Sequence, residues 1–177
     1  ALNRGIKEAH GEIIMNLDSD VFLTPTSIKE MVLYLLKNPR IGAATANVEI
    51  DLETLENNKG KLTPFQSFLA KSQFLEYVHS FHLGRHYQSL VGSLYTLSGA
   101  FSAFRREILF KTPLYSNETV SEDFDITLEL HRKRVGIGYA KNAKALLEPI
   151  LDIDRLYSQR VRWSRGQIEV NSKHRYM

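Results

Sequence analysis

The fold is decided by residues 13–50, which read IIMNLDSDVFLTPTSIKEMVLYLLKNPRIGAATANVEI. The run at 13–17 is short and almost wholly apolar, as buried parallel strands are. Thr26 or Ser27 is predicted to cap the next helix, with Glu30 three residues after Ser27 as in a capping box. Apolar side chains then recur at helical spacing from Ile28 to Leu36. Residues 42–50 read as another strand. The segment therefore predicts a strand, a helix and a second strand.

The rest of the chain continues this alternation. Residues 1–10 have helical spacing, and the patterns that follow predict a polar loop at 51–64, a helix at 65–82, strands at 93–98 and 101–104, a helix from Ser121 to Arg134, short strands from Gly136 and a last helix from about Asp152. We expect an α/β fold with a mainly parallel central sheet flanked by helices. The length of 177 residues and the absence of a linker predict one domain over 1–177.

The amino-acid composition excludes some kinds of binding site and favours others. The chain has no cysteine, which excludes disulfides and thiolate metal sites. Its longest apolar run, Met31 to Leu36, is far shorter than the roughly 20 residues of a spanning helix. Residues 131–177 hold 11 of the 23 Lys and Arg residues but only 4 of the 20 Asp and Glu residues. This basic quarter is typical of a solvated helix, a phosphate site or a surface that meets an anionic membrane.

Two acidic side chains follow the first strand. Asp18 and Asp20 lie just past its carboxyl end, where open α/β sheets bind ligands. In extended backbone, residues two apart point to one side, so both carboxylates can face one site. Oxygen ligands without His or Cys suit Mg²⁺ or Mn²⁺. The competing interpretation is an acidic turn before the next helix.

A second acidic pair, Glu122 and Asp123, opens a helix after Ser121. Acids in a first turn complement the helix dipole, which alone explains the residue types. At a cleft, the same position presents a carboxylate that can act as a general base.

The last helix carries the only tryptophan. Gln159, Arg162, Trp163 and Gly166 share one face, and Ile153, Leu156, Tyr157, Arg160 and Val161 form a neighbouring, mostly apolar face that we expect to pack. An arginine fork suits phosphate oxygens, and an indole suits the flat side of a sugar. The alternative is a basic helix with Trp163 in the core.

A small-residue turn, Ser98-Gly99-Ala100, precedes the basic pair Arg105-Arg106. Small residues let a ligand approach the backbone closely, although a tight turn into a strand explains them equally well. His79, His82 and His86 approach the spacing of metal ligands on a helix, but they are interpreted as structural or surface residues.

Taken in order, LDSD, SGAFSAFRRE, SEDFD and QRVRW resemble the family 2 glycosyltransferases. The QxxRW pattern is similar to the processive membrane synthases of cellulose, chitin, hyaluronan and poly-N-acetylglucosamine. FQSFLAKSQFLEY at 65–77 is most similar to the bacterial poly-N-acetylglucosamine synthases. The resemblance covers nearly the whole chain.

The resemblance implies a role for each matching residue. Asp18 matches the aspartate that contacts the nucleotide, Asp20 the metal ligand, and Asp123, beside Glu122, the catalytic base. The diphosphate is assigned to Gln159, Arg160 and Arg162, and the acceptor sugar to Trp163, Ser98 and Gly99. The implied fold is GT-A-like, with a Mg²⁺ or Mn²⁺ cofactor.

The resemblance also implies the partners. These are a nucleotide-sugar donor, expected to be UDP-linked, a glycan or lipid-linked acceptor, and a membrane met through flanking segments, with the catalytic domain on the cytoplasmic side; no nucleic acid is expected. The family's domain begins with a strand–helix–strand unit that binds uridine, and this chain starts after that unit, so we expect an N-terminally truncated domain.

Three alternatives remain open. The chain could come from a non-processive relative that adds one sugar, or it could be a catalytically silent binding module. A metal-dependent phosphohydrolase could also use Asp18 and Asp20, but it would have no need of QRVRW.

Overall fold

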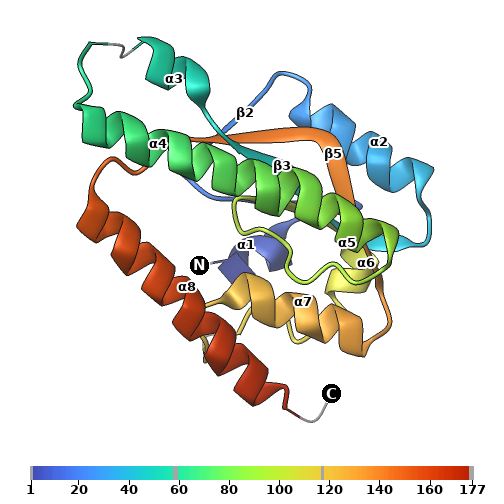
Figure 1. Ribbon diagram of the computed structural model, residues 1–177. Helices are drawn as coiled ribbons and strands as arrows, with labels where there is room; N and C mark the ends of the chain where they lie inside the picture. Colours follow the sequence, from blue (N-terminus) through green and yellow to red (C-terminus); the bar gives the residue numbers. More distant parts are fainter. Residues whose placement is uncertain (1, 58–59, 117, 176–177) are drawn as a thin grey trace.

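The computed structural model describes residues 2–57, 60–116 and 118–175. Its helices are α1 (Leu2–Glu8), α2 (Ser27–Lys37), α3 (Leu52–Asn57), α4 (Pro64–Tyr77), the π-helix η1 (Val78–Arg85), α5 (His86–Leu90), α6 (Arg106–Leu109), α7 (Glu122–Arg132) and α8 (Ile153–Lys173). Its strands are β1 (Ile13–Leu17), β2 (Val21–Leu23), β3 (Ile41–Ile50), β4 (Phe101–Arg105) and β5 (Gly136–Leu147). Figure 1 shows these elements around one central sheet.

The sheet is mixed rather than mainly parallel. Its strand order is β1-β4-β3-β5-β2, and only the β3–β5 pair is parallel. The α/β class and the flanking helices are confirmed, but the expected parallel sheet is wrong. The reason is that β4 returns antiparallel between β1 and β3 after the long excursion through α4, and β2 runs back along β5.

Two hydrophobic cores lie on opposite faces of the sheet. On one face, Met31 and Leu35 of α2 and Tyr77 of α4 pack over the buried side chains of β3. On the other, α1 and α7 contribute Ile6, Ile126 and Leu130. Alternate residues of β3 serve the two faces, since Ala44 belongs to the first core and Ala43 to the second. These two cores hold the sheet between helical layers.

Several local predictions differ from the structure. Residues 93–98 form no strand, because the backbone N–H groups of Leu97 and Ser98 donate to the hydroxyls of Thr127 and Thr45 instead of to a neighbouring strand. A short helix, α3, occupies part of the predicted loop at 51–64. The capping box predicted for α2 does not form; Ser27 donates its hydroxyl proton to Lys144 O.

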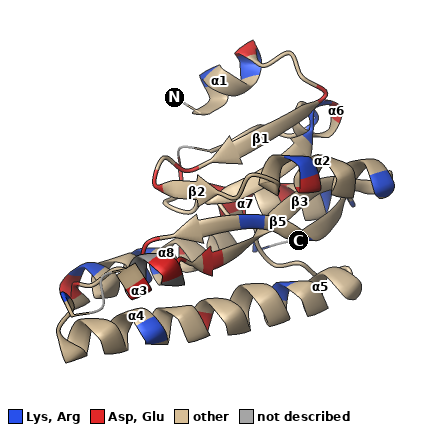
Figure 2. Ribbon diagram, turned by 90° about the horizontal axis from the view of Figure 1, so that it is seen from above, with Lys and Arg blue, Asp and Glu red and all other residues tan. Residues whose placement is uncertain are grey.

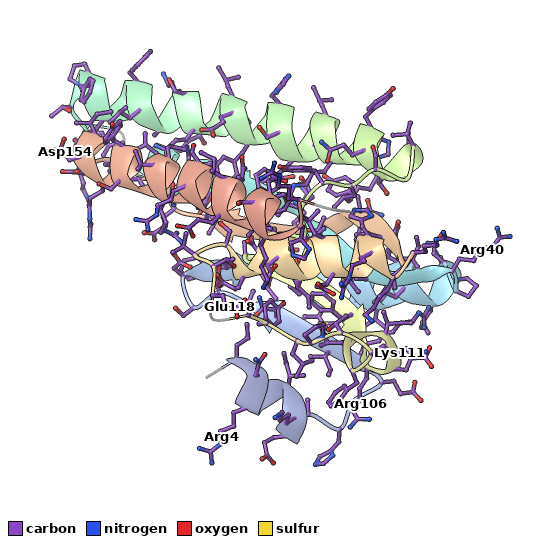
Figure 3. All side chains as sticks on the ribbon, turned by 90° about the horizontal axis from the view of Figure 1, so that it is seen from below. Arg4, Arg40, Arg106, Lys111, Glu118 and Asp154 are labelled. Atoms are coloured by element: carbon purple, nitrogen blue, oxygen red, sulfur yellow. The ribbon has the colours of Figure 1, made fainter. Side chains whose placement is uncertain are left out.

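The helix predicted at 65–82 is longer than expected. A capping box of Thr63 and Gln66 starts α4, which continues through η1 and α5 as one long rod along an edge of the molecule (Figure 2). Helix α8 lies beside this rod, and an ion pair between Arg160 and Glu76 joins the two (Figure 3). Among the described residues, no helix combines the length and apolar character needed to cross a bilayer.

Candidate active site

One cavity of about 270 Å³ opens where β1, the 98–100 turn, α7 and α8 meet. Nine of the ten predicted site residues line it: Asp18, Asp20, Ser98, Gly99, Glu122, Asp123, Gln159, Arg162 and Trp163. These residues come from four segments spread over most of the chain, so the fold, and not sequence proximity, assembles them. The cavity joins carboxylates on one side to an amide, a guanidinium and an indole on the other.

Gly99 brings two of these carboxylates together. Its N–H donates to Asp123 Oδ2 at 3.2 Å, and the side chain of Asn16 donates to its carbonyl at 3.4 Å. A Cβ atom at this position would lie 3.4 Å from Asp18 Oδ2 and 3.6 Å from Asp123 Oδ2. The absent side chain therefore leaves a space that both carboxylates face, as the prediction of a close backbone approach requires.

Asp123 is held by its own backbone surroundings. Its Oδ1 accepts the N–H of Phe124 at 2.7 Å, and its carbonyl accepts the hydroxyl of Thr127 at 2.6 Å. Burial raises the pKa of Asp123, and the N–H donors from Phe124 and Gly99 offset part of that rise. The result is a fixed carboxylate that is a stronger base than an ordinary aspartate.

The acidic side of the cavity carries concentrated negative charge. Partial burial, followed by the charges of Asp20, Asp123 and Glu122, raises the pKa of Asp18, while the Arg162 guanidinium lowers it. Four mutually repelling carboxylates outnumber the cationic side chains that line the same cavity, and this excess of negative charge favours a cationic ligand.

This electrostatics predicts a pH-dependent effect of Asp18→Asn. The pKa of Asp18 is higher in the folded chain than in the unfolded chain. Its contribution to the free energy of unfolding therefore falls as pH rises from the unfolded pKa through the folded pKa. In metal-free buffer, Asp18→Asn should therefore be more stable than wild type at neutral pH, and the gain should vanish below the pKa of an unfolded aspartate. Urea denaturation at several pH values measures this. Asp154→Asn, outside the cavity, should give no such gain.

Asp18 and Asp20 could hold a divalent cation only together with other ligands. Among the described residues, no group of three or more His, Asp or Glu side chains is placed to hold a metal. Mg²⁺ and Mn²⁺ nevertheless bind through one or two carboxylates and complete their shell with substrate phosphates and water. The accessible carboxylates of Asp18 and Asp20, with their unbalanced charge, fit this shared mode.

Helix α8 supplies the other wall, and one predicted residue points elsewhere. Gln159, Arg162 and Trp163 line the cavity, but Arg160 pairs with Glu76 Oε2 at 2.7 Å and lies over the Trp163 ring at 4.3 Å. Arg160 therefore anchors α8 to α4 and supports Trp163. The Trp163 indole packs partly against the core and partly lines the cavity. The structure therefore agrees in part with each of the two sequence-based interpretations, a core residue and a surface for a sugar.

Much of the neighbouring face of α8 that we expected to pack is exposed instead. Ile153, Tyr157 and Val161 face solvent, while Gly166 and Val170 are buried. A Cβ at Gly166 would lie 2.7 Å from Ser121 Cβ and would overlap its hydroxyl. Gly166 thus lets α8 pack directly against the start of α7. This contact lies three residues along α8 from Trp163, and on α7 it is next to Glu122 and Asp123.

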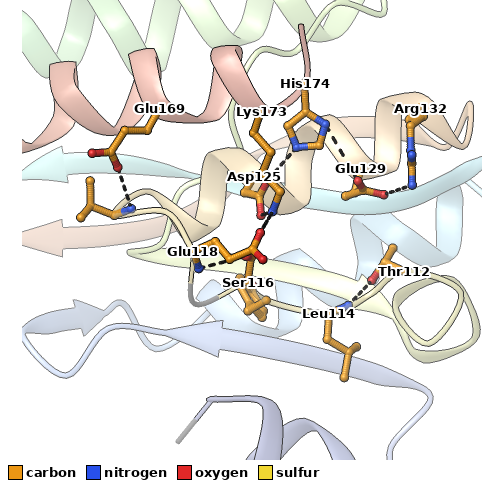
Figure 4. Close-up of polar contacts among 12 residues, drawn as sticks. Thr112, Leu114, Ser116, Glu118, Asp125, Glu129, Arg132, Glu169, Lys173 and His174 are labelled. Carbon is orange, nitrogen blue, oxygen red and sulfur yellow. Dashed lines mark hydrogen bonds and ion pairs between the residues drawn. The ribbon is translucent and has the colours of Figure 1, made fainter. Parts of the chain in front are cut away.

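A charged cluster fixes the far end of α8 on α7 (Figure 4). His174 Nε2 lies 2.6 Å from Asp125 Oδ1, and Lys173 Nζ lies 3.0 Å from Asp125 Oδ2 and 3.2 Å from Glu118 Oε2. Burial alone would lower the pKa of Lys173, but its bonds to Asp125 and Glu118 outweigh burial and raise it. Gly166 and this cluster therefore set the position of α8 at two points.

Arg85 is a cavity residue that the sequence analysis missed. It ends the π-helix η1, stacks on Phe81 at 4.3 Å and donates to the Thr96 carbonyl. Burial lowers its pKa to about 10, so it remains a cation, and its charge favours the ionised form of Asp123. The sequence does mark Arg85 as an isolated charge, since it is the only Lys, Arg, Asp or Glu between residues 77 and 104.

Comparison with known proteins shows the family to which the chain belongs. The sequence model described as glycosyltransferase like family 2 matches residues 1–166. The chain belongs to glycosyltransferase family 2. The fold of this glycosyltransferase domain is of the GT-A type.

Two bacterial relatives support membership of the same family. The domain is 33% identical over 170 residues to a poly-beta-1,6-N-acetyl-D-glucosamine synthase of Staphylococcus epidermidis and 29% identical to the enzyme of that name from Staphylococcus aureus. In both cases the match covers 96% of this chain and 38% of the relative. The chain thus spans well under half the length of these relatives.

Solved structures share the fold. A Pyrobaculum calidifontis mannosyltransferase, in complex with GDP-Man and Mn²⁺, aligns with a TM-score of 0.69 at 16% identity, over 98% of this chain and 42% of that one. Glucosyl-3-phosphoglycerate synthase of Mycobacterium tuberculosis, with Mn²⁺, UDP-glucose and glycerol 3-phosphate, aligns with a TM-score of 0.53 at 17% identity, over 97% and 52%.

Proposed function

We propose that this domain catalyses transfer of N-acetylglucosamine from a UDP-linked donor to the end of a growing polysaccharide, with inversion at the anomeric carbon. The observation that carries the proposal is the cavity in which Asp123 faces Asp18 across Gly99, with Arg162 and Trp163 on the opposite wall. The names of the staphylococcal relatives support the choice of sugar and polymer.

The chain's own residues account for the reaction. The ionised carboxylate of Asp123 takes the proton of an acceptor hydroxyl held near Ser98 and Gly99. The acceptor oxygen bonds to the anomeric carbon as that carbon's bond to the diphosphate breaks, and the diphosphate leaves with the bonding electrons. Attack from the side opposite the leaving group inverts the centre. Glu122, beside Asp123, adds to the negative field there.

The other wall positions the two substrates. Arg162 and Gln159 offer N–H donors to the departing diphosphate, and Trp163 offers a flat surface to the acceptor's terminal sugar. Asp20, with Asp18 on the nucleotide, would hold Mg²⁺ or Mn²⁺, which when bound supplies positive charge against the diphosphate. Metal in the complexes of both structural neighbours supports this choice.

A transfer assay tests the proposal. The full-length protein, incubated with UDP-N-acetylglucosamine, Mn²⁺ and a short N-acetylglucosamine oligomer, should extend the oligomer by many units. Addition of one sugar only would support the non-processive alternative. Complete absence of transfer, with an intact fold, would support the silent binding module.

We further propose that the outer face of the α4–η1–α5 rod lies against the cytoplasmic side of the membrane. Six large apolar side chains recur along this face at helical spacing, each between 55% and 72% exposed: Phe65, Phe68, Leu75, Leu83, Tyr87 and Leu90. Figure 2 shows few charged residues on the rod. A row of exposed apolar side chains of this kind is typical of an interaction surface, and the basic C-terminal quarter favours anionic lipid.

Vesicle binding measures this second proposal. The chain should sediment with vesicles of phosphatidylcholine and phosphatidylglycerol. Leu83→Ser with Leu90→Ser should lower its partition coefficient by about a hundredfold or more, since each buried leucine contributes about 1.5–3 kcal/mol. Ile28→Ser with Leu36→Ser removes equally exposed side chains from α2 and should leave binding unchanged. Equal losses for both pairs would contradict a specific membrane face.

A further inference from the structure

A second cavity, of about 330 Å³, lies at the opposite end of α7 from Asp123. Three parts of the chain form it: the turn from α2 to β3, helix α6 with the residues just after it, and the turn from α7 to β5. Glycines let these turns meet, since a Cβ at Gly136 would lie 2.7 Å from Arg40 O and one at Gly42 would lie 2.5 Å from Val135 Cγ1. The 11-residue helix α7 spans about 16 Å, so the two cavities are separate.

Positive charge dominates this cavity. Arg40, Lys111, Lys133 and Arg134 are exposed around it, and Glu107 is the one acidic residue that lines it. Figure 3 shows Arg40 and Lys111 at the end of the molecule away from Asp154. Within the described ranges, none of these four cations forms an ion pair. Arg105 also lines the cavity, but its guanidinium is bound to the carbonyls of Ile41 and Leu35.

The backbone at Arg134 is unusual for its residue type. Its φ of 55° lies in the left-handed region, where a residue after a helix end is normally glycine. The turn itself is ordinary, because Arg134 N donates to His131 O at 2.8 Å and Val135 N donates to Leu130 O at 3.0 Å. An arginine is thus present at a position where glycine would fit with less strain, which indicates a use for its side chain.

The helix dipole does not explain the whole group. A cation near the carboxyl end of α7 is favourable, and this accounts for Lys133. Arg40 lies three residues beyond the end of α2, outside the last turn where the dipole acts, and the dipole gives no preference for arginine over glycine at 134. Like charges brought together without partners favour an anionic ligand.

We propose that this cavity binds a small molecule carrying two or more phosphate groups. Guanidinium forks from Arg40 and Arg134 suit phosphate oxygens, and Lys111 and Lys133 add compact charges. The volume lies in the range of small-molecule sites. This site lies away from Asp18 and Asp20, so it is distinct from the proposed donor site. We therefore expect it to bind phosphate without the divalent cation that those two aspartates would hold.

Calorimetric titration of the full chain with inorganic tripolyphosphate in EDTA tests the proposal. Wild type should bind one equivalent at this cavity, and Arg134→Gly should weaken binding at least tenfold while raising the melting temperature, because glycine relieves the left-handed backbone. Lys111→Gln should also weaken binding. Arg132→Gln removes a neighbouring charge that is paired with Glu129 and should change affinity less than twofold.

Three outcomes would overturn it. If the wild-type protein binds no tripolyphosphate, the proposed site does not exist. Unchanged binding by Arg134→Gly places the anion elsewhere, for example at Arg162. Equal weakening by Arg132→Gln and Arg134→Gly shows attraction to net charge alone. The melting temperature of Arg134→Gly separates loss of the ligand from loss of the fold.

Discussion

Asp123→Asn should lower the transfer rate of the full-length protein by about 10²–10⁴-fold, the range that a positioned general base contributes. The asparagine keeps the shape of the side chain but cannot accept the acceptor's proton. One amide oxygen can still accept the N–H of Phe124, so α7 should keep its position. The measurement is the initial rate with UDP-N-acetylglucosamine, together with the affinity for UDP, which should survive.

The pH profile and a control variant sharpen this test. Because burial raises the pKa of Asp123, the acidic limb of the wild-type rate profile should lie at higher pH than for an ordinary aspartate. Asp154→Asn removes an acid from the first turn of α8, outside the cavity, and should keep the wild-type rate. Normal turnover by Asp123→Asn would remove Asp123 from the role of base.

Gly166→Ala should damage both stability and transfer. The added methyl group would lie 2.7 Å from Ser121 Cβ and 3.3 Å from Ser121 N, so α8 must move away from the start of α7. Overpacking of this kind costs about 1–3 kcal/mol. The shift also separates Trp163 from Asp123, and a displacement of about 1 Å can reduce rate about 10²-fold. Urea denaturation and the transfer assay measure the two effects.

A second substitution should rescue this variant. Ser121→Gly removes the overlapping side chain, and the Ser121 hydroxyl makes no capping bond that would be lost. The double variant should therefore recover most of the stability and rate, giving a clear coupling energy between the two positions. Gly5→Ala, on α1, meets no atom within 4 Å and should be harmless. Additive losses in the double variant would exclude the proposed contact.

The sequence predicted the site better than the sheet. Motif spacing identified nine residues that the fold brings into one cavity, because the two acidic motifs lie at the end of a strand and the start of a helix that local patterns define, and QRVRW repeats along one face of α8. Strand order has no comparable local signal. The insertion of β4 between β1 and β3 follows from packing of distant segments, so alternation of helices and strands suggested a parallel sheet that does not form.

The individual misses have similar causes. Arg160 matches a motif, but only the fold shows Glu76 beside it. Residues 93–98 look like a strand, yet side-chain hydroxyls of Thr45 and Thr127 take the place of a neighbouring strand. Ile153 and Tyr157 have the spacing of a packed face, but α8 turns its Gly166 face inward because only a glycine allows close contact with α7.

Titration calorimetry with UDP, with and without Mn²⁺, tests the central claim most directly. If the cavity is a metal-dependent nucleotide-sugar site, the full-length protein should bind UDP strongly only with Mn²⁺, and Asp20→Asn should remove that dependence while Asp154→Asn preserves it. Equal UDP binding with and without Mn²⁺, or full metal dependence in Asp20→Asn, would contradict the account.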